Sequence, residues 1–175
     1  MIQKIFLSLL FLCAGSLLFA QKPPVIKVYA YSQAILPGTR RVNTVDESGK
    51  EIKEVAERKI SYSIYVEQKR STVIKIISVW INGKSYTAKT DTVSQTPVET
   101  KTGDPANTTV TLVPKSFNTI LLITPGSEKL PIKQPSSYLK KAVASSELVI
   151  IYEWKGKFWY SKVKKIKELK PLAAV

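Results

Sequence analysis

The chain has 175 residues, with 27 lysine or arginine residues against 13 aspartate or glutamate residues, so its formal net charge is +14. It has no histidine, which removes the commonest general base and metal ligand and every Ser-His-Asp or Cys-His arrangement. Its one cysteine, Cys13, lies in the N-terminal segment, so the rest of the chain has no disulfide, thiol nucleophile or thiolate metal site.

The N-terminus has the pattern of a secretory signal peptide. A single lysine precedes the uncharged apolar run Ile5–Ala20, and the following QKPP sequence cannot continue a helix. A membrane-spanning helix needs about 20 apolar residues, and this run is shorter. We therefore expect cleavage after Ala20, with Ser16 as a second site and an uncleaved anchor as the alternative. The end of the run resembles those of exported Bacteroidetes proteins, which implies the periplasm, the cell surface or the exterior of a bacterium.

The expected mature chain, Gln21–Val175, has 155 residues and suits a single domain (21–175). Cleavage removes one lysine, so the net charge falls from +14 to +13. In an exported protein this charge favours polyanionic partners, such as lipopolysaccharide, an acidic glycan or an acidic envelope protein, and we do not expect nucleic acid. Because the lysines are spread along the whole chain, solubility alone also explains the charge. No transmembrane segment is expected after cleavage.

The first half of the mature chain predicts β-strands. Val25–Ile35 is rich in β-branched and tyrosine residues and predicts the first strand. The polar stretch Thr39–Arg58 contains a turn at Glu47–Lys50, and it is either a minor hairpin or an irregular excursion. Ile60–Glu67 alternates strictly, which indicates a half-buried antiparallel strand with four residues on its apolar side: Ile60, Tyr62, Ile64 and Val66.

Asn82-Gly83 predicts a hairpin between Thr72–Ile81 and Lys84–Val93, because a type I′ turn needs positive φ at both central residues. A two-residue loop fixes the register. The expected core face holds Ile77, Val79 and Ile81, and the other face holds Ile74, Ile76, Ser78 and Trp80. Among hydroxyl side chains, Trp80 is either a platform for stacking a sugar or a tryptophan covered by a neighbouring loop.

The next segment is expected to contain the longest loop, Ser94–Asn107. Two short strands should follow, Thr108–Pro114 and Phe117–Thr124, and Pro125-Gly126 should end the second. Ser136–Ser145 is the one predicted helix, with a serine cap at its start and apolar residues at helical spacing.

A second hairpin is predicted within Leu148–Ile166, with its turn at Lys155-Gly156. Its expected core face holds Leu148, Ile150, Tyr152, Trp154 and Trp159. The opposite face holds Val149, Ile151, Glu153, Phe158, Tyr160, Lys162 and Lys164. This second face is partly apolar, and the preceding helix is its nearest cover. The end of the chain, Leu169–Val175, is expected to fray.

The whole pattern is about eight strands and one short helix near 136–145, with no βαβ rhythm. We expect an all-β fold, a single antiparallel β-sandwich of the Ig-like kind. A partly open β-barrel is the alternative.

The sequence favours a non-enzymatic binding or interaction module with no metal or cofactor. Aromatic side chains flanked by cations can stack on sugars and neutralise phosphates. The candidate ligand-binding residues are Phe158, Tyr160, Lys162, Lys164, Lys165 and Trp80. The alternative is a purely structural role, as a core hairpin whose lysines lie along a solvent-exposed edge and discourage pairing with the edge strand of another molecule.

Two alternatives stay open. One is a small hydrolase acting on an anionic polymer with a pair of carboxylates from Asp46, Glu51 and Glu54, although such a charged cluster is more often a solvated face. The other is a structural subunit that donates or accepts a β-strand.

Overall fold

The structure is a computed structural model that describes residues 22–36, 44–45, 48, 51–52, 59–101, 108–128 and 136–173. The expected signal peptide (1–20), with Cys13, lies outside these residues, as do Asp46, Glu54 and the side chain of Glu51. Within the described part of the chain, no helix is long and apolar enough to cross a membrane.

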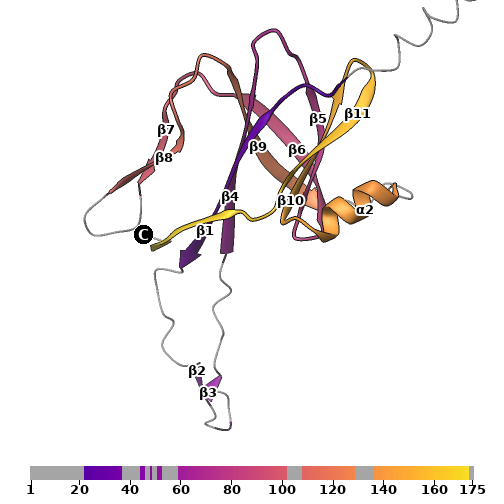
Figure 1. The fold of residues 1–175 in the computed structure, drawn as a ribbon. Helices are drawn as coiled ribbons and strands as arrows, with labels where there is room; N and C mark the ends of the chain where they lie inside the picture. The colour runs from indigo at the N-terminus through magenta and orange to yellow at the C-terminus, as the bar shows by residue number, and fades with distance from the viewer. Residues whose placement is uncertain are drawn as a thin grey trace, which may run out of the picture.

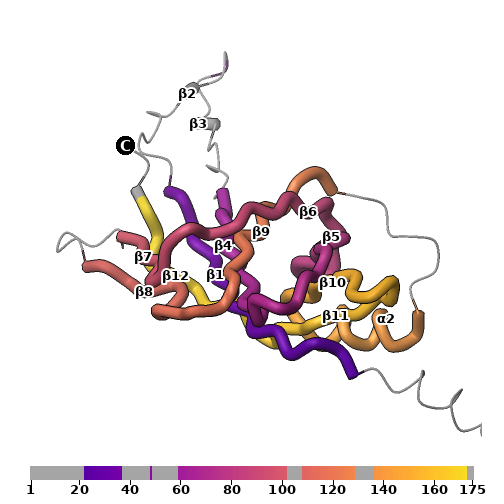
Figure 2. The backbone as a smooth tube through the Cα atoms, turned by 90° about the horizontal axis from the view of Figure 1, so that it is seen from above, coloured from indigo at the N-terminus to yellow at the C-terminus, as the bar shows by residue number. Residues whose placement is uncertain are grey.

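Eight strands form one mixed sheet that curls into a half-barrel (Figures 1 and 2). The order across the sheet is β11-β10-β5-β6-β9-β4-β1-β12, and all neighbours are antiparallel except β1 and β12. These strands are β1 (Lys27–Leu36), β4 (Lys59–Gln68), β5 (Lys75–Ile81), β6 (Lys84–Thr92), β9 (Thr119–Glu128), β10 (Leu148–Trp154), β11 (Lys157–Val163) and β12 (Lys167–Ala173).

Five shorter elements complete the described fold. Two two-stranded sheets are formed by β2 (Thr44–Val45) with β3 (Glu51–Ile52), and by β7 (Val98–Lys101) with β8 (Thr109–Val113). The β2–β3 pair is the minor hairpin expected from the sequence. The helix α2 (Ser137–Ala144) is the helix expected near 136–145, and the Ser136 hydroxyl caps it by accepting a 3.3 Å hydrogen bond from the amide of Leu139.

The all-β class with one short helix is confirmed, but the architecture is not a clear sandwich. A sandwich would divide the strands between two sheets, whereas here hydrogen bonds continue without a break through all eight strands. The partly open barrel is therefore nearer to the observed fold. The parallel pairing of β12 with β1 was not predicted, because an all-antiparallel fold was expected.

Two apolar clusters lie on opposite sides of the curled sheet. The concave core contains buried residues from five strands of the sheet together with Ile166, which follows β11; its largest fully buried members are Ile64, Val66, Val79, Ile123, Leu148 and Ile150. The second cluster lies between the sheet and the β7–β8 hairpin and is built on Tyr31, Tyr65, Leu112, Val113 and Ile120. Each sheet face is thus buried for part of its extent.

The Asn82-Gly83 turn forms as predicted, with φ of 49° and 83° and with Val79 opposite Tyr86. The predicted faces of β5 are correct for Val79 and Ile81 but wrong for the residues that precede Ser78. The pairing of β10 with β5 shifts between Ile151 and Tyr152, which leaves Ile77 as an extra residue in a β-bulge. The bulge moves Ile74 and Ile76 into the concave core and leaves Ile77 only partly buried.

Three other predictions are corrected. The strand expected to stop at Pro125-Gly126 continues to Glu128, with Pro125 opposite Ala88 and an irregularity in the pairing with β6 directly after the proline. The expected loop Ser94–Asn107 contains β7, which pairs with β8. The end of the chain does not fray through Ala173, since β12 hydrogen-bonds to β1.

Candidate ligand-binding face of β11

The β10–β11 hairpin has the predicted register, with Trp154 opposite Lys157 and Tyr152 opposite Trp159. Lys155 and Gly156 have φ of 50° and 72°, as a type I′ turn requires. The predicted core face does face the core. Leu148, Ile150 and Tyr152 are buried in the concave cluster, and Trp154, Trp159 and Val163 pack against it. These tryptophans are therefore not available to a ligand as exposed platforms.

The opposite face of the hairpin is covered only in part. Val149 and Ile151 are buried, although they belong to neither apolar cluster. The helix α2 contacts β10, lies outside the curl of the sheet and buries its own Ala142 (Figure 2). We infer that α2 covers this face along β10, as expected from the sequence.

The same face of β11 is bare. The side chain of Phe158 is 69 % exposed and that of Tyr160 is 43 % exposed, and Lys162 is exposed as well. Alternate residues of a strand point to one face and lie about 7 Å apart, so these three side chains form a row along the edge of the sheet. Lys164 and Lys165 follow the row directly and are both exposed. We call these five residues the β11 face.

Trp80 shares a sheet face with this row but does not touch it. Trp80 is opposite Val149, and Val149 is opposite Lys162, so Trp80 and Lys162 are separated by two strand spacings, or roughly 10 Å. The indole is partly buried, and its Nε1 has no hydrogen-bond partner among the described residues. Of the six candidate residues, five follow one another along the edge of the sheet and just beyond the end of β11, and Trp80 lies two strands away.

The β11 face carries uncompensated positive charge. The ion pairs seen in the described residues join Lys84 to Glu128 and Lys89 to Asp91, each at 3.5 Å. Both lie on the β6 side of the sheet, so neither reduces the charge of Lys162, Lys164 or Lys165. By register Glu147 is opposite Lys164, and its carboxylate accepts a hydrogen bond from the amide of Ile166, while Glu153 is opposite Phe158 at the far end of the row.

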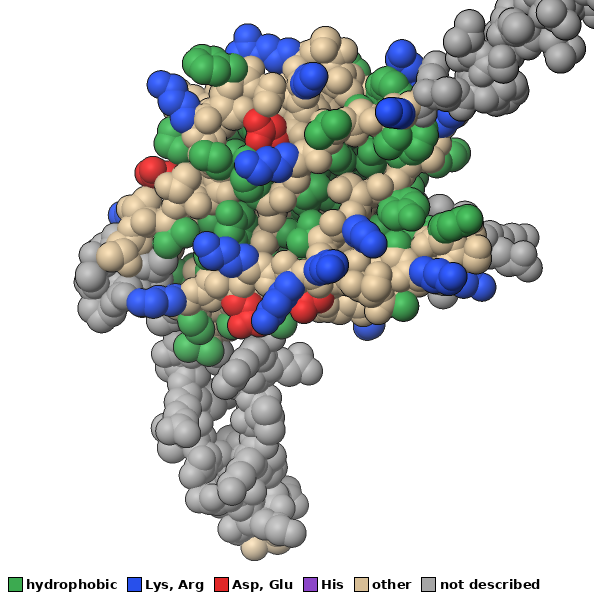
Figure 3. Space-filling model, in the orientation of Figure 1, with side chains coloured by type: hydrophobic (Ala, Val, Ile, Leu, Met, Phe, Trp, Pro, Cys, Tyr) green, Lys and Arg blue, Asp and Glu red, His purple; other side chains and the backbone are tan. Residues whose placement is uncertain are grey.

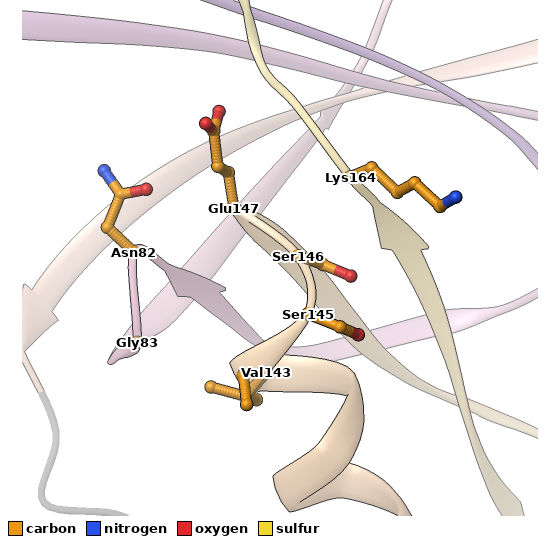
Figure 4. A pocket seen from close by; sticks show the side chains of 8 residues that line it. Asn82, Gly83, Val143, Ser145, Ser146, Glu147 and Lys164 are labelled. Carbon is orange, nitrogen blue, oxygen red and sulfur yellow. The ribbon is translucent and has the colours of Figure 1, made fainter.

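A pocket of about 440 Å³ opens at the end of the half-barrel beside α2 (Figure 4). It forms where the Asn82-Gly83 turn, the α2–β10 connection and Lys164 meet. Its carboxylate, Glu147, accepts a 2.7 Å hydrogen bond from the amide of Ile166, and Lys164 points away from it. Glycoside hydrolysis by the usual route needs two carboxylates that flank the substrate, and this pocket offers one that is already engaged.

Glu67 is the most strongly engaged carboxylate among the described residues, and its environment is structural. It accepts hydrogen bonds from Ser116 Oγ at 2.6 Å, Tyr29 OH at 2.7 Å and Asn118 Nδ2 at 2.7 Å. These donors, Ser116 first, hold the pKa of Glu67 below its ordinary value. A lowered pKa makes Glu67 a weak base. The described residues contain no cluster of acidic or other ligands suited to a metal ion.

No family model matches the chain, and no curated protein or solved structure is similar to it. The function of this protein is therefore inferred from the geometry of its own surface.

Proposed function

We propose that this protein is an exported, non-enzymatic binding module that holds an anionic glycan or lipopolysaccharide of the bacterial envelope on its β11 face. The observation that supports it most is the exposure of Phe158 and Tyr160 beside buried neighbours. Glu153 and Ile151 are their direct cross-strand partners, and Ile151 is buried where Tyr160 is open. A face that α2 covers along β10 but leaves free along β11 is available to a ligand.

The chemistry of the row matches an anionic carbohydrate. Aromatic faces stack on the apolar faces of sugar rings, and ammonium groups attract phosphate or carboxylate groups. On the β11 face the two aromatic residues come first, and three lysines follow toward the end of the strand. A ligand of several sugar units with acidic groups at one end can engage both parts.

The proposal is tested by measuring the affinity of the mature chain for purified lipopolysaccharide and for heparin, used as a sulfated glycan. Replacing Lys162, Lys164 and Lys165 by glutamate should weaken binding at least tenfold, because each lysine near an anionic surface contributes about 1 kcal/mol. The matched control replaces Lys59, Lys101 and Lys140, which are exposed on β4, β7 and α2 and alter the net charge equally.

Equal losses in the two variants would show that binding follows net charge alone and would overturn the assignment to β11. An unchanged affinity in the Lys162, Lys164 and Lys165 variant would overturn it as well. A loss confined to that variant, with further weakening in Tyr160→Ala, supports a ligand on this face.

A further inference from the structure

One end of the half-barrel gathers the connections that are furthest from α2. The antiparallel pairs Lys27–Glu67, Gln68–Thr119 and Lys75–Glu153 all lie at this end. It therefore carries the β6–β7 connection together with four other segments, which are the segment before β1, the β4–β5 turn, the β8–β9 connection and the β10–β11 turn with the start of β11. The Asn82-Gly83 turn and α2 lie at the opposite end (Figure 1).

Each of these four connections exposes a large apolar side chain. They are Val25 (86 % exposed), Val73 (81 %), Phe117 (81 %) and Phe158 (69 %). Singly exposed apolar residues are ordinary on protein surfaces. Four of them on four separate connections at one end of a sheet are less readily explained, because none is needed to fill the core.

The same end is strongly basic. Its connections carry eight exposed cations: Lys22, Lys27, Lys69, Arg70, Lys75, Lys115, Lys155 and Lys157. The acidic residues near this end are Glu67, whose carboxylate accepts three hydrogen bonds, the partly buried Glu153, and Asp91 on β6, which forms an ion pair with Lys89. Basic and hydrophobic side chains lie beside one another along the upper edge in Figure 3. We call this end, with its four apolar residues and eight cations, the basic rim.

Two of the cations are held at the rim by aromatic rings. Lys27 Nζ lies 4.8 Å from the ring centre of Tyr29, and Lys155 Nζ lies 4.7 Å from that of Trp154. Cation–π contacts of this length restrict the lysine side chains without neutralising them. Positive charge is thus kept near the four exposed apolar side chains of the rim, which we call the tips.

We propose that the basic rim docks on an anionic lipid surface, with its four apolar side chains entering the headgroup region and its cations facing lipid phosphates. Protein surfaces that lie at a membrane interface combine apolar residues that penetrate with lysine and arginine residues that attract anionic lipid. The core of a protein–protein interface is instead depleted of lysine. At the rim the apolar residues stand apart with cations between them, which fits a fluid headgroup layer better.

The rim shares only Phe158 with the β11 face, and the proposal stands whether or not that face binds a glycan.

The test uses the mature chain, Gln21–Val175, with vesicles of phosphatidylcholine containing about a third phosphatidylglycerol, measured by co-sedimentation. The tip variant carries Val25→Ser, Val73→Ser and Phe117→Ser and leaves Phe158 intact. A buried apolar side chain contributes about 1.5 kcal/mol or more, or about tenfold in affinity, so the variant should bind at least tenfold more weakly. The matched control is Ile60→Ser with Tyr138→Ser, whose side chains are 53 % and 74 % exposed at the opposite end.

A second measurement reports insertion directly. The mature chain has no cysteine, so an environment-sensitive fluorophore on Val73→Cys or Phe117→Cys labels one tip alone. Its emission should shift to the blue with the anionic vesicles and not with pure phosphatidylcholine, and a label on Tyr138→Cys should not shift.

Equal binding by the tip variant and the wild type would overturn the proposal, as would equal losses in the tip and control variants. Tip labels that respond to soluble heparin but not to vesicles would assign the rim to a soluble polyanion and also overturn it. Because the tip variant keeps Tyr160 and all three β11 lysines, normal heparin affinity in a variant that no longer binds vesicles separates the two proposals.

Discussion

Ile151 and Tyr160 lie directly opposite each other on β10 and β11 with their side chains on the same face, yet Ile151 is 8 % exposed and Tyr160 is 43 % exposed. The area of the sheet that α2 covers therefore ends between β10 and β11. On the β10 side of this boundary the sheet is buried, and on the β11 side it is exposed to solvent.

Substitutions on the buried and the exposed face of the β10–β11 hairpin should have different effects on the free energy of unfolding. Ile150→Ala empties a fully buried site in the concave core and should lower the free energy of unfolding by about 2–5 kcal/mol. Phe158→Ala, eight residues along the chain, removes a largely exposed ring and should change it by less than about 0.5 kcal/mol. Urea denaturation measures both. A cost for Phe158→Ala equal to that of Ile150→Ala would mean that the ring is covered.

Glu147 should stabilise the segment that follows β11 in its position against the core. Its carboxylate accepts a hydrogen bond from the amide of Ile166, and its own amide donates to the carbonyl of Lys164 at 3.2 Å. Glu147→Ala leaves the amide of the buried Ile166 without this partner and should cost about 1–3 kcal/mol. Hydrogen exchange of the Ile166 amide should accelerate.

Glu168→Ala is the control for this prediction, since Glu168 is exposed at the start of β12, two residues after Ile166. If the Ile166 amide keeps its protection in Glu147→Ala, the hydrogen bond does not hold this segment.

Glu67 should make stability depend on pH on the acid side. Hydrogen bonds from Ser116, Tyr29 and Asn118 lower its folded-state pKa below the ordinary value of 4.5. Their stabilising effect is therefore complete above the unfolded-state pKa and is lost as the pH falls through the folded-state pKa. Glu67→Gln places an amide donor among three donors and should cost about 1–3 kcal/mol at pH 7.

The difference in unfolding free energy between wild type and Glu67→Gln should shrink as the pH falls below the ordinary carboxyl pKa of 4.5 and through the lowered folded-state pKa of Glu67. Denaturant titrations at pH 7 and pH 3 measure it. A difference that is the same at both pH values would contradict the role given to the ionised carboxylate.

Local pattern was enough to predict most of the strands, both type I′ hairpins and the capped helix, but it missed β7 and β12. Asn82-Gly83 and Lys155-Gly156 set their own registers, because a two-residue loop leaves no freedom in the pairing. The β11 face followed from that register, since alternation alone separates Phe158 and Tyr160 from Trp154 and Trp159.

Long-range pairing could not be predicted in the same way. The bulge at Ile77 arises from the contact of β5 with β10, which lies far along the chain, and it reverses the faces of Ile74 and Ile76. The parallel strand β12 has no local signal, because its pairing with β1 joins the two ends of the described chain. The burial of Val149 and Ile151 likewise depends on where α2 packs.

The measurement that tests the β11 face most directly is the location of a bound ligand by amide chemical shifts during titration with heparin. We predict that the largest changes fall on Phe158, Tyr160 and Lys162 and continue to Lys164 and Lys165, while the amides of α2 and β7 stay unchanged. Changes that centre on α2 or spread evenly over all exposed lysines would contradict the account.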